Sequence, residues 1–284
     1  MKHQPRRLVP GDEAMLDAFL AQHADSSMFL RSNLRRAGLV DGDGPYQGIY
    51  VAAMAEDAVL GVVARFWNGM VVVQAPYHVE ALTPLAVAAS GRKIVGISGP
   101  GGQVNRARSV LAKGEATEDS TDDLFALDLG ALQIPTALAQ GRLAVRHRDA
   151  SEIALLTEWS VSFNREALGF AESAGLRRHC ADHIGRLQAE KAQFVLTAVE
   201  VPVAYAAFNA VLTDRVQIGG VWTPPALRGR GYARNVVAGA LLAARETGVQ
   251  RAILFTDTDN AAARAAYRSL GFARIGDYGI VIFA

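Results

Sequence analysis

Apolar residues recur along this chain in two groups of short runs, one group in each half. Each group holds three runs rich in Val, Ile and Ala, separated by residues typical of turns. In the first group Asn68-Gly69 marks a hairpin, because both central turn positions need positive φ. The pattern therefore predicts three neighbouring antiparallel strands per half, over residues 48–55, 58–67 and 70–73 and over residues 194–199, 203–211 and 216–223.

Helical spacing surrounds both groups of strands. Between residues 232 and 245 the apolar side chains recur at i, i+3, i+4 and i+7, and a glycine follows. A shorter helix is predicted over residues 260–270, where the next glycine ends it. In the first half the apolar spacing is helical from residue 8 to residue 38. The acidic stretch 115–123 is predicted to be solvated and to precede a strand.

The two halves follow one order of elements: strand, helices, three antiparallel strands, helix, strand, helix, strand. This repeat predicts an α+β (mixed α/β) fold of two tandem domains, each a mostly antiparallel central sheet flanked by helices. The length of 284 residues supports two domains, because domains typically hold about 100–200 residues. We place the boundary in the stretch 134–141, which gives domains of residues 1–138 and 139–284.

Composition narrows the classes of partner and site. With 29 basic and 28 acidic residues the net charge is +1, so no nucleic-acid partner is expected. The single cysteine, Cys180, excludes an internal disulfide framework and favours a reducing cytoplasm. No stretch reaches the roughly 18 apolar residues of a membrane span, and no signal peptide is expected. His179 and His183 have a zinc-like spacing, but no third ligand is evident, so no metal is expected.

The residues that point to chemistry lie in the segment 221–233, which leaves a strand, turns, and opens a helix. Backbone N–H groups at a helix start are unsatisfied and, with the helix dipole, bind phosphate oxygens. Gly229 and Gly231 allow the backbone to approach an anion closely, and Arg228 and Arg230 add positive charge. The segment lacks the Lys-Ser/Thr ending of a Walker loop and the spacing of a Rossmann fingerprint, which disfavours ATP and NAD.

With these residues in place, the second half of the chain resembles the GNAT superfamily of acyl-CoA-dependent N-acyltransferases. The family signature Arg/Gln-x-x-Gly-x-Gly/Ala is matched by Arg228, Gly231 and Ala233. A second family feature is matched downstream by Asn260, then Tyr267, then Leu270-Gly271-Phe272. The resemblance covers the chain from about residue 143 onward. The predicted fold is then two tandem GNAT-like domains.

The resemblance implies that acetyl-CoA is the cosubstrate and that its acetyl group passes directly to a primary amine through a ternary complex. The backbone amides of 229–233 would hold the pyrophosphate, and the strand edge 220–223 would pair with the pantetheine arm. An N–H near Val221 would polarise the thioester carbonyl, and Tyr267 would protonate the departing thiolate. The residues implied to bind the cofactor are Val221, Trp222, Thr223, Arg228, Gly229, Arg230, Gly231, Tyr232, Ala233 and Asn260.

The sequence departs from the family pattern on the strand before the phosphate-binding turn. That strand carries Gln217 and no carboxylate, where the family often supplies a Glu as base. Glu166 is the best candidate for contacting or deprotonating the amine, and Asp214 is weaker because it falls in a turn. By pattern alone Tyr267 is also a core tyrosine and Asn260 also a helix N-cap.

The first half lacks the phosphate-binding turn, because residues 74–80 contain no arginine or glycine. It is therefore similar to a degenerate GNAT domain without the CoA signature. The acceptor stays open between a small-molecule amine and a peptide N-terminus, and the chain between monomer and homodimer. The alternative function is a non-catalytic CoA-binding sensor or structural module.

Overall fold

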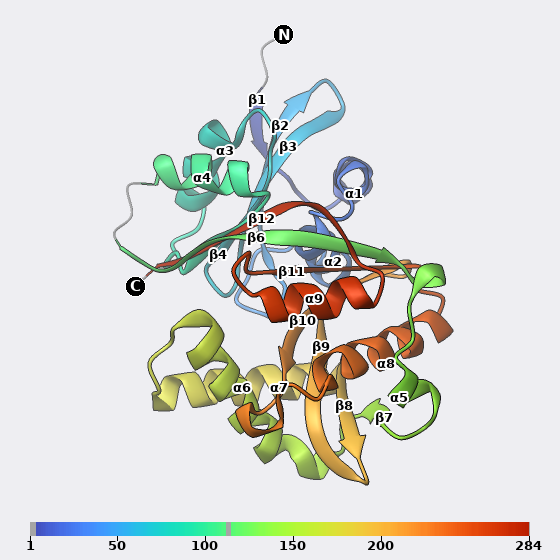
Figure 1. Ribbon diagram of the computed structural model, residues 1–284. Coiled ribbons are helices and arrows are strands. Elements are labelled where there is room, and N and C mark those ends of the chain that lie inside the picture. The colour runs from blue at the N-terminus through green and yellow to red at the C-terminus, as the bar shows by residue number, and fades with distance from the viewer. Residues whose placement is uncertain (1–3, 112–114, 284) are drawn as a thin grey trace. The chain divides into compact units, whose positions relative to one another are not determined.

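The computed structural model describes residues 4–111 and 115–283. These residues form an α+β fold, as predicted, and divide into two compact units (Figure 1). One unit is Met1–Asp123 with Gly276–Ala284, and the other is Leu124–Ile275. The sequence-based boundary between residues 138 and 139 lies inside the second unit and stays a prediction about the tandem copies.

The first unit is built on a mostly antiparallel sheet with the strand order β1-β2-β3-β4-β5-β12-β6. The predicted hairpin strands form, and only β4 and β5 pair in parallel among the registers assigned in this unit. Its strands are β1 (Gln4–Arg7), β2 (Gly48–Ala55), β3 (Ala58–Phe66), β4 (Met70–Gln74), β5 (Gly96–Gly99) and parts of β6 (Ala116–Asp128) and β12 (Ala273–Phe283). Its helices are α1 (Glu13–Gln22), α2 (Met28–Ala37), α3 (Val79–Ala88) and α4 (Gly101–Ser109).

The helices expected between residues 8 and 38 form as α1 and α2. The residues between them turn, and the Ser26 hydroxyl donates to the His23 carbonyl. One sequence-based expectation for this unit is wrong. The acidic stretch 115–123 is largely strand, since β6 begins at Ala116. Its exposure alternates along residues 116–121, so one side of the strand is solvated while the other packs.

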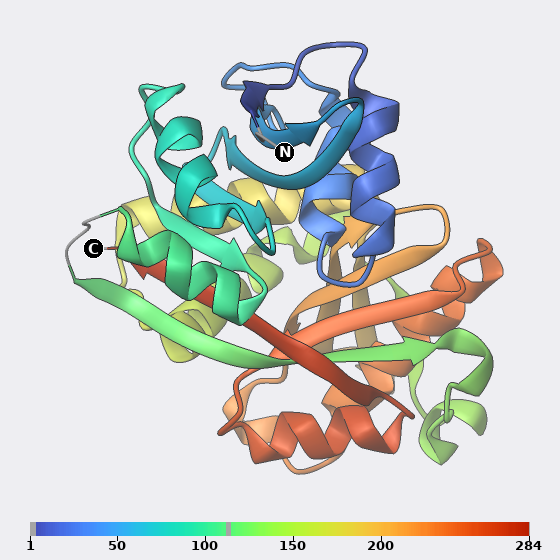
Figure 2. The ribbon, with the colours of Figure 1, turned by 90° about the horizontal axis from the view of Figure 1, so that it is seen from above.

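Each face of the first sheet is covered by its own pair of helices (Figure 2). Tyr50 and Ala52 of β2 pack in a core with α1 and α2, whereas their neighbours Ile49 and Val51 pack in a second core with α3 and α4. Side chains of a strand alternate between the two faces, so a strand buried on both sides is apolar throughout. This double burial explains the uninterrupted apolar run in β2.

The second unit repeats the plan with the strand order β6-β11-β10-β9-β8-β7. β10 pairs in parallel with β11 and antiparallel with β9. Its further strands are β7 (Ala144–His147), β8 (Gln193–Ala198), β9 (Val201–Val211), β10 (Arg215–Trp222) and β11 (Arg251–Thr256). Its helices are α5 (Thr136–Ala139), α6 (Ile153–Leu168), α7 (Ala174–Ala189), α8 (Tyr232–Glu246) and α9 (Ala261–Ser269).

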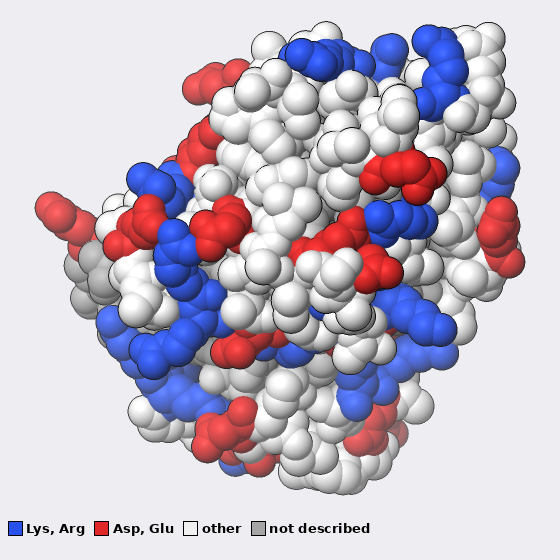
Figure 3. Space-filling view, turned by 90° about the horizontal axis from the view of Figure 1, so that it is seen from below, with Lys and Arg blue, Asp and Glu red and all other residues white. Residues whose placement is uncertain are grey.

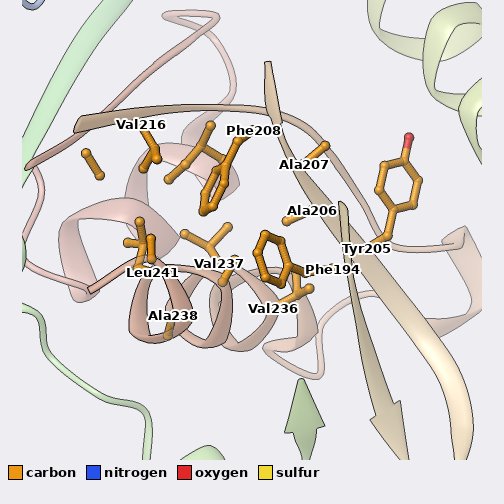
Figure 4. Close-up of a cluster of buried hydrophobic side chains, with 14 of the residues drawn as sticks. Phe194, Tyr205, Ala206, Ala207, Phe208, Val216, Val236, Val237, Ala238 and Leu241 are labelled. Carbon is orange, nitrogen blue, oxygen red and sulfur yellow. The ribbon is translucent and has the colours of Figure 1, made fainter. Parts of the chain in front are cut away.

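Helix α8 packs against one face of the second sheet (Figure 4). Phe194 of β8 and Phe208 of β9 point at Val237 and Leu241 of α8, and all four are buried. Tyr205, also on β9, points to the opposite face. The α8 side is therefore filled by apolar side chains, and the other face of β8, β9 and β10 carries a different set of residues.

Gly239 lets α8 lie directly against β7. A Cβ at Gly239 would stand 2.4 Å from the Cβ of Val145, far inside van der Waals contact.

We expect Gly239→Ala to destabilise the protein by about 1 kcal/mol, because overpacking costs about 1–3 kcal/mol and exceeds the roughly 1 kcal/mol that alanine gains in a helix. The midpoint of thermal unfolding measures the change. Gly185→Ala in α7 is the matched control, since nothing lies within 4 Å of its added Cβ. That control should raise the midpoint, and a rise in both variants would contradict the packing argument.

Candidate functional site

The ladder between the parallel strands β10 and β11 ends before the strands do. Its pairs run from Arg215–Arg251 to Gln217–Ile253, yet β10 continues to Trp222 and β11 to Thr256. Both strands lie wholly within the described part of the chain. Backbone groups of β10 beyond Gln217 therefore have no β11 ladder partner. An unpaired strand edge of this kind can accept an extended ligand with amide groups.

A bulge bends β10 along this unpaired edge. Its register with β9 shifts between Gln217 and Ile218 and again between Gly219 and Trp222. Gly220 has φ +61°, a left-handed conformation that favours glycine. Bulges re-aim strands and terminate pairing, which accounts for the divergence of β10 from β11.

The start of α8 presents a run of free backbone N–H groups. Gly231 is the N-cap residue with φ +73°, and no side chain caps the helix. Within the described ranges, the N–H groups of residues 229–234 have no hydrogen-bond acceptor. Consecutive free N–H groups at the positive end of a 15-residue helix form an anion-binding site. We call residues 229–234 the N–H cradle.

Arg228 lies just before the cradle and is held by Glu166 of α6. Its terminal nitrogens are 2.8 and 2.9 Å from the two Glu166 carboxylate oxygens, and its Nε donates to the Thr223 carbonyl at 3.1 Å. The guanidinium also lies over the Trp222 ring, 4.8 Å from its centroid. Glu166, the expected contact for the amine, is thus brought to the cradle by an ion pair. Its role toward the amine stays a prediction.

The strand side of the site combines one half-buried and two buried residues. Val221 is half-buried, whereas Trp222 and Thr223 are buried. Trp222 Nε1 and Thr223 Oγ1 are inaccessible and have no hydrogen-bond partner in the part of the chain that is described. Phe163 of α6 packs edge-to-face on Trp222, with ring centroids 6.4 Å apart. A buried polar atom without a protein partner indicates strain, a catalytic role, or a bound water or ion.

Two residues of the first turn of α8 were missed by the sequence reasoning, which stopped at Tyr232 and Ala233. The Arg234 Nε lies 3.1 Å from where a Cβ on Gly231 would stand, so this cation lies at the cradle. The Asn235 amide donates to the Gly231 carbonyl at 2.8 Å and fixes the turn. Spacing could have found both, because positions three and four residues after an N-cap lie at the same helix end.

Helix α9 carries the two remaining predicted residues. Asn260 caps it, since its Oδ1 accepts from the Ala263 N–H at 3.0 Å, which confirms the N-cap alternative. Tyr267 is 9% exposed and packs edge-to-face on Phe272. Burial raises the pKa of Tyr267 to about 12, so its hydroxyl is protonated at neutral pH. No described residue hydrogen-bonds that hydroxyl, which leaves it able to donate.

Within the described ranges, no group of three or more His, Cys, Asp or Glu residues is arranged so that it could hold a metal ion. Burial, with Arg186 nearby, lowers the pKa of His183 to about 4, so this histidine is neutral at pH 7. Basic and acidic side chains are interspersed over the face seen in Figure 3. No helix among residues 4–111 and 115–283 is long and apolar enough to span a membrane.

The corresponding turn of the first unit is occupied by its own side chains. The Ala75 N–H donates to Gln103 Oε1 at 2.6 Å, and Arg106 donates to the Pro76 carbonyl at 2.5 Å. Arg106 also lies 3.5 Å from Glu80, an acidic residue in the first turn of α3. A carboxylate at a helix start opposes the binding of an anion there. The turn of the first unit therefore lacks the left-handed glycines of the cradle and has an acidic residue at its helix start.

Comparison with known proteins finds a family match for the part of the chain that contains the cradle. The sequence profile described as "Acetyltransferase (GNAT) family" matches residues 153–272, which include the whole site. Comparison with curated protein sequences gives no match.

Solved structures resemble the chain over nearly its full length. A GNAT-family acetyltransferase from Colwellia psychrerythraea is 14% identical, with 99% of this chain and 100% of that chain covered and a TM-score of 0.54. A Drosophila protein is 11% identical, with 99% of each chain covered and a TM-score of 0.67. A tandem GNAT protein from the clavulanic acid biosynthesis pathway is 9% identical, with 99% and 98% covered and a TM-score of 0.59. These similarities confirm the predicted fold of two GNAT-like domains.

Inorganic pyrophosphate tests the cradle directly. We expect it to bind, and Gly231→Ala to weaken the binding about tenfold or more, because alanine disfavours φ +73° and the N–H groups would turn away. Calorimetry at fixed salt measures the affinity. Gly248→Ala is the matched control: it changes a left-handed glycine, φ +93°, just beyond the other end of α8. Equal weakening in both variants would mean that α8 was merely destabilised.

Proposed function

We propose, from the membership of residues 153–272 in the GNAT acetyltransferase family, that this chain transfers the acetyl group of acetyl-CoA directly to a primary amine. The transfer takes place in a ternary complex, and the acceptor is a small-molecule amine or a peptide N-terminus. The observation that carries the proposal is the N–H cradle beside the unpaired edge of β10. The single buried cysteine, Cys180, supports a cytoplasmic location.

The chain offers groups that match the two recognition elements of coenzyme A. Its pyrophosphate fits the free N–H groups of the cradle and the adjacent Arg230, which is exposed and pairs with no described residue. Its amide-containing arm fits the unpaired edge of β10 from Val221 to Thr223, with Asn260 on the α9 side. An N–H near Val221 would then polarise the thioester carbonyl, which makes the carbonyl carbon open to attack.

Tyr267 supplies the proton that the reaction needs. The amine nitrogen forms a C–N bond to the acyl carbon while the C–S bond breaks, and Tyr267 gives its phenolic proton to the sulfur. The proton lost by the amine returns to the phenolate through water. Because burial raises its pKa to about 12, Tyr267 holds its proton at neutral pH and is able to donate it.

Glu166 connects cofactor binding with the acceptor. In the ion pair with Arg228 its carboxylate is fully engaged. When Arg228 turns to a phosphate of the cofactor, Glu166 is released and becomes available to the amine. In this proposal Glu166 serves the acceptor only after acetyl-CoA is bound.

A CoA-binding sensor without turnover is the second candidate function. It is favoured by β10, which carries Gln217 and no carboxylate where a base would lie close to the acyl group. The first unit has the same role in both proposals. It binds no cofactor, because its turn over residues 74–80 carries neither the glycines nor the arginines of the cradle.

Acetyl-CoA binding followed by thiol release over an amine panel tests the proposal. We expect saturable binding by calorimetry and amine-dependent release of CoA. Changing Arg228 and Gly231 together to alanine should reduce affinity by at least about tenfold, because a charge and the cradle geometry are both lost. The paired change of Arg142 and Gly248 is the control away from the cradle. Undiminished binding in the first double variant would refute the cofactor assignment, and binding without release on any amine would favour the sensor.

Tyr267→Phe separates catalysis from cofactor binding. We expect turnover to fall by about 10²-fold or more with acetyl-CoA affinity nearly unchanged, because only the proton donor is removed. The pKa of about 12 means that ionisation of Tyr267 should not reduce wild-type turnover until the pH approaches that value. A pH series of turnover and a binding isotherm check both points. Full activity of the phenylalanine variant would remove Tyr267 from the mechanism.

A further inference from the structure

Three side-chain amides gather on the face of the second sheet that α8 does not cover. Gln193 of β8 pairs with Ala207 of β9, and Ala207 pairs with Gly219 of β10, so these residues form one row across the sheet. Ala207 faces away from α8, like Tyr205 (Figure 4). Asn209 and Gln217 stand two residues along their strands from this row and therefore share its face. We call Gln193, Asn209 and Gln217 the amide group.

Asn209 is placed by the bulge in β10 and β9. It is the extra residue of β9, since Gln217 pairs with Ala210 and Ile218 pairs with Phe208. A Cβ on Gly219 would stand 1.9 Å from Asn209 Nδ2, so the amide lies directly over the bare glycine. Gly219 is thus required for Asn209 to lie flat on β10. This brings a half-exposed amide to the stretch where β10 leaves β11.

The amide group has hydrogen-bonding capacity that the described residues leave unused. Gln193 and Gln217 are each 1% exposed. Both amide atoms of Gln193 and the Oε1 of Gln217 are inaccessible and have no partner there, while Gln217 Nε2 donates to the Ile218 carbonyl at 2.6 Å. The side chain of Asn209 likewise bonds to no described residue. An unsatisfied buried polar group costs about 1–3 kcal/mol, so such a group is kept where something binds it.

The strands that carry the amide group hold almost no charge. Strands β8, β9 and β10 contain one charged residue, Arg215, and its guanidinium bonds to Asp214 at 2.9 and 3.0 Å. Side-chain amides both donate and accept, as do carboxamides and hydroxyls, whereas a carboxylate only accepts and an ammonium only donates. A second charge on the acceptor would find no countercharge on these strands and would lose its hydration.

We infer that the acceptor is an amine flanked by uncharged hydrogen-bonding groups, carboxamides or hydroxyls, which the amide group binds. This inference rests on the function proposed above and names the substrate class of the same site. Asn209 and Gln217 hold the groups next to the reacting amine at the edge of β10, and Gln193 holds the more distant part. Amines that carry a free carboxylate or a second ammonium are disfavoured.

Four acceptors that share one side chain test the inference on the full chain: leucinamide, leucinol, leucine and 1,2-diamino-4-methylpentane. We expect kcat/KM, corrected for the fraction of neutral amine, to be at least about tenfold higher for the first two. Asn209→Ala should raise the KM of leucinamide about 3–10-fold and leave the KM of acetyl-CoA within about twofold. Asn209→Asp should shift the preference toward the diamine by about tenfold or more. Asn68→Asp, in the exposed hairpin of the first unit, makes the same chemical change and should have no effect.

The outcomes separate this inference from the proposed function. Equal or better use of leucine or the diamine by the wild type overturns the inference while acetyl transfer stands. An unchanged leucinamide KM in Asn209→Ala also overturns it, and means that the amides bind internal water. If no amine promotes thiol release, the proposed function fails. Calorimetry of leucinamide with the CoA-loaded protein then tests the amide group by itself. Binding that Asn209→Ala weakens supports the amide group as a binding site, and no binding refutes it. Retained acetyl-CoA affinity shows that each variant is folded.

Discussion

Parallel strands β10 and β11 are paired from Arg215 to Gln217 and then separate, and the rest of the site follows from that separation. A continuous ladder would use the backbone groups of β10 internally and leave no edge for a ligand. The first register shift, where Asn209 is the extra residue of β9, lays Asn209 over Gly219, and the second lies where β10 leads into the turn before α8. Strand edge, helix start and side-chain amides therefore meet beside two neighbouring irregularities.

The two units show how little of a shared fold decides binding. Each has a parallel strand pair followed by a turn into a helix. In the second unit the turn holds left-handed glycines, and Glu166 forms an ion pair with Arg228 just before the cradle. In the first unit Gln103 and Arg106 bond to the same stretch of backbone. The two turns therefore differ in their glycines and in the side chains beside them.

Sequence predicted what local patterns encode. Apolar runs gave the strands around Asn68-Gly69, and the glycines and arginines of 228–231 gave the cradle, because turn chemistry is read within a few residues. Contacts between distant segments could not be read in this way. Glu166 meets Arg228 across 62 positions, and Asn209 lies over Gly219 only because a bulge shifts the register. The position of the break between α1 and α2 could not be read from the sequence, since helical spacing continues on both sides of it.

The division of the chain also sets an order of events during synthesis. Residues 279–282 of β12 pair with residues 96–99 of β5, and both belong to the first unit. A ribosome must therefore translate all of the second unit before the first can complete its sheet. Until then one edge of β5 lacks its final partner strand, and the backbone N–H and C=O groups along that edge are exposed. The nascent first unit is accordingly the part of this protein that would most need protection from aggregation.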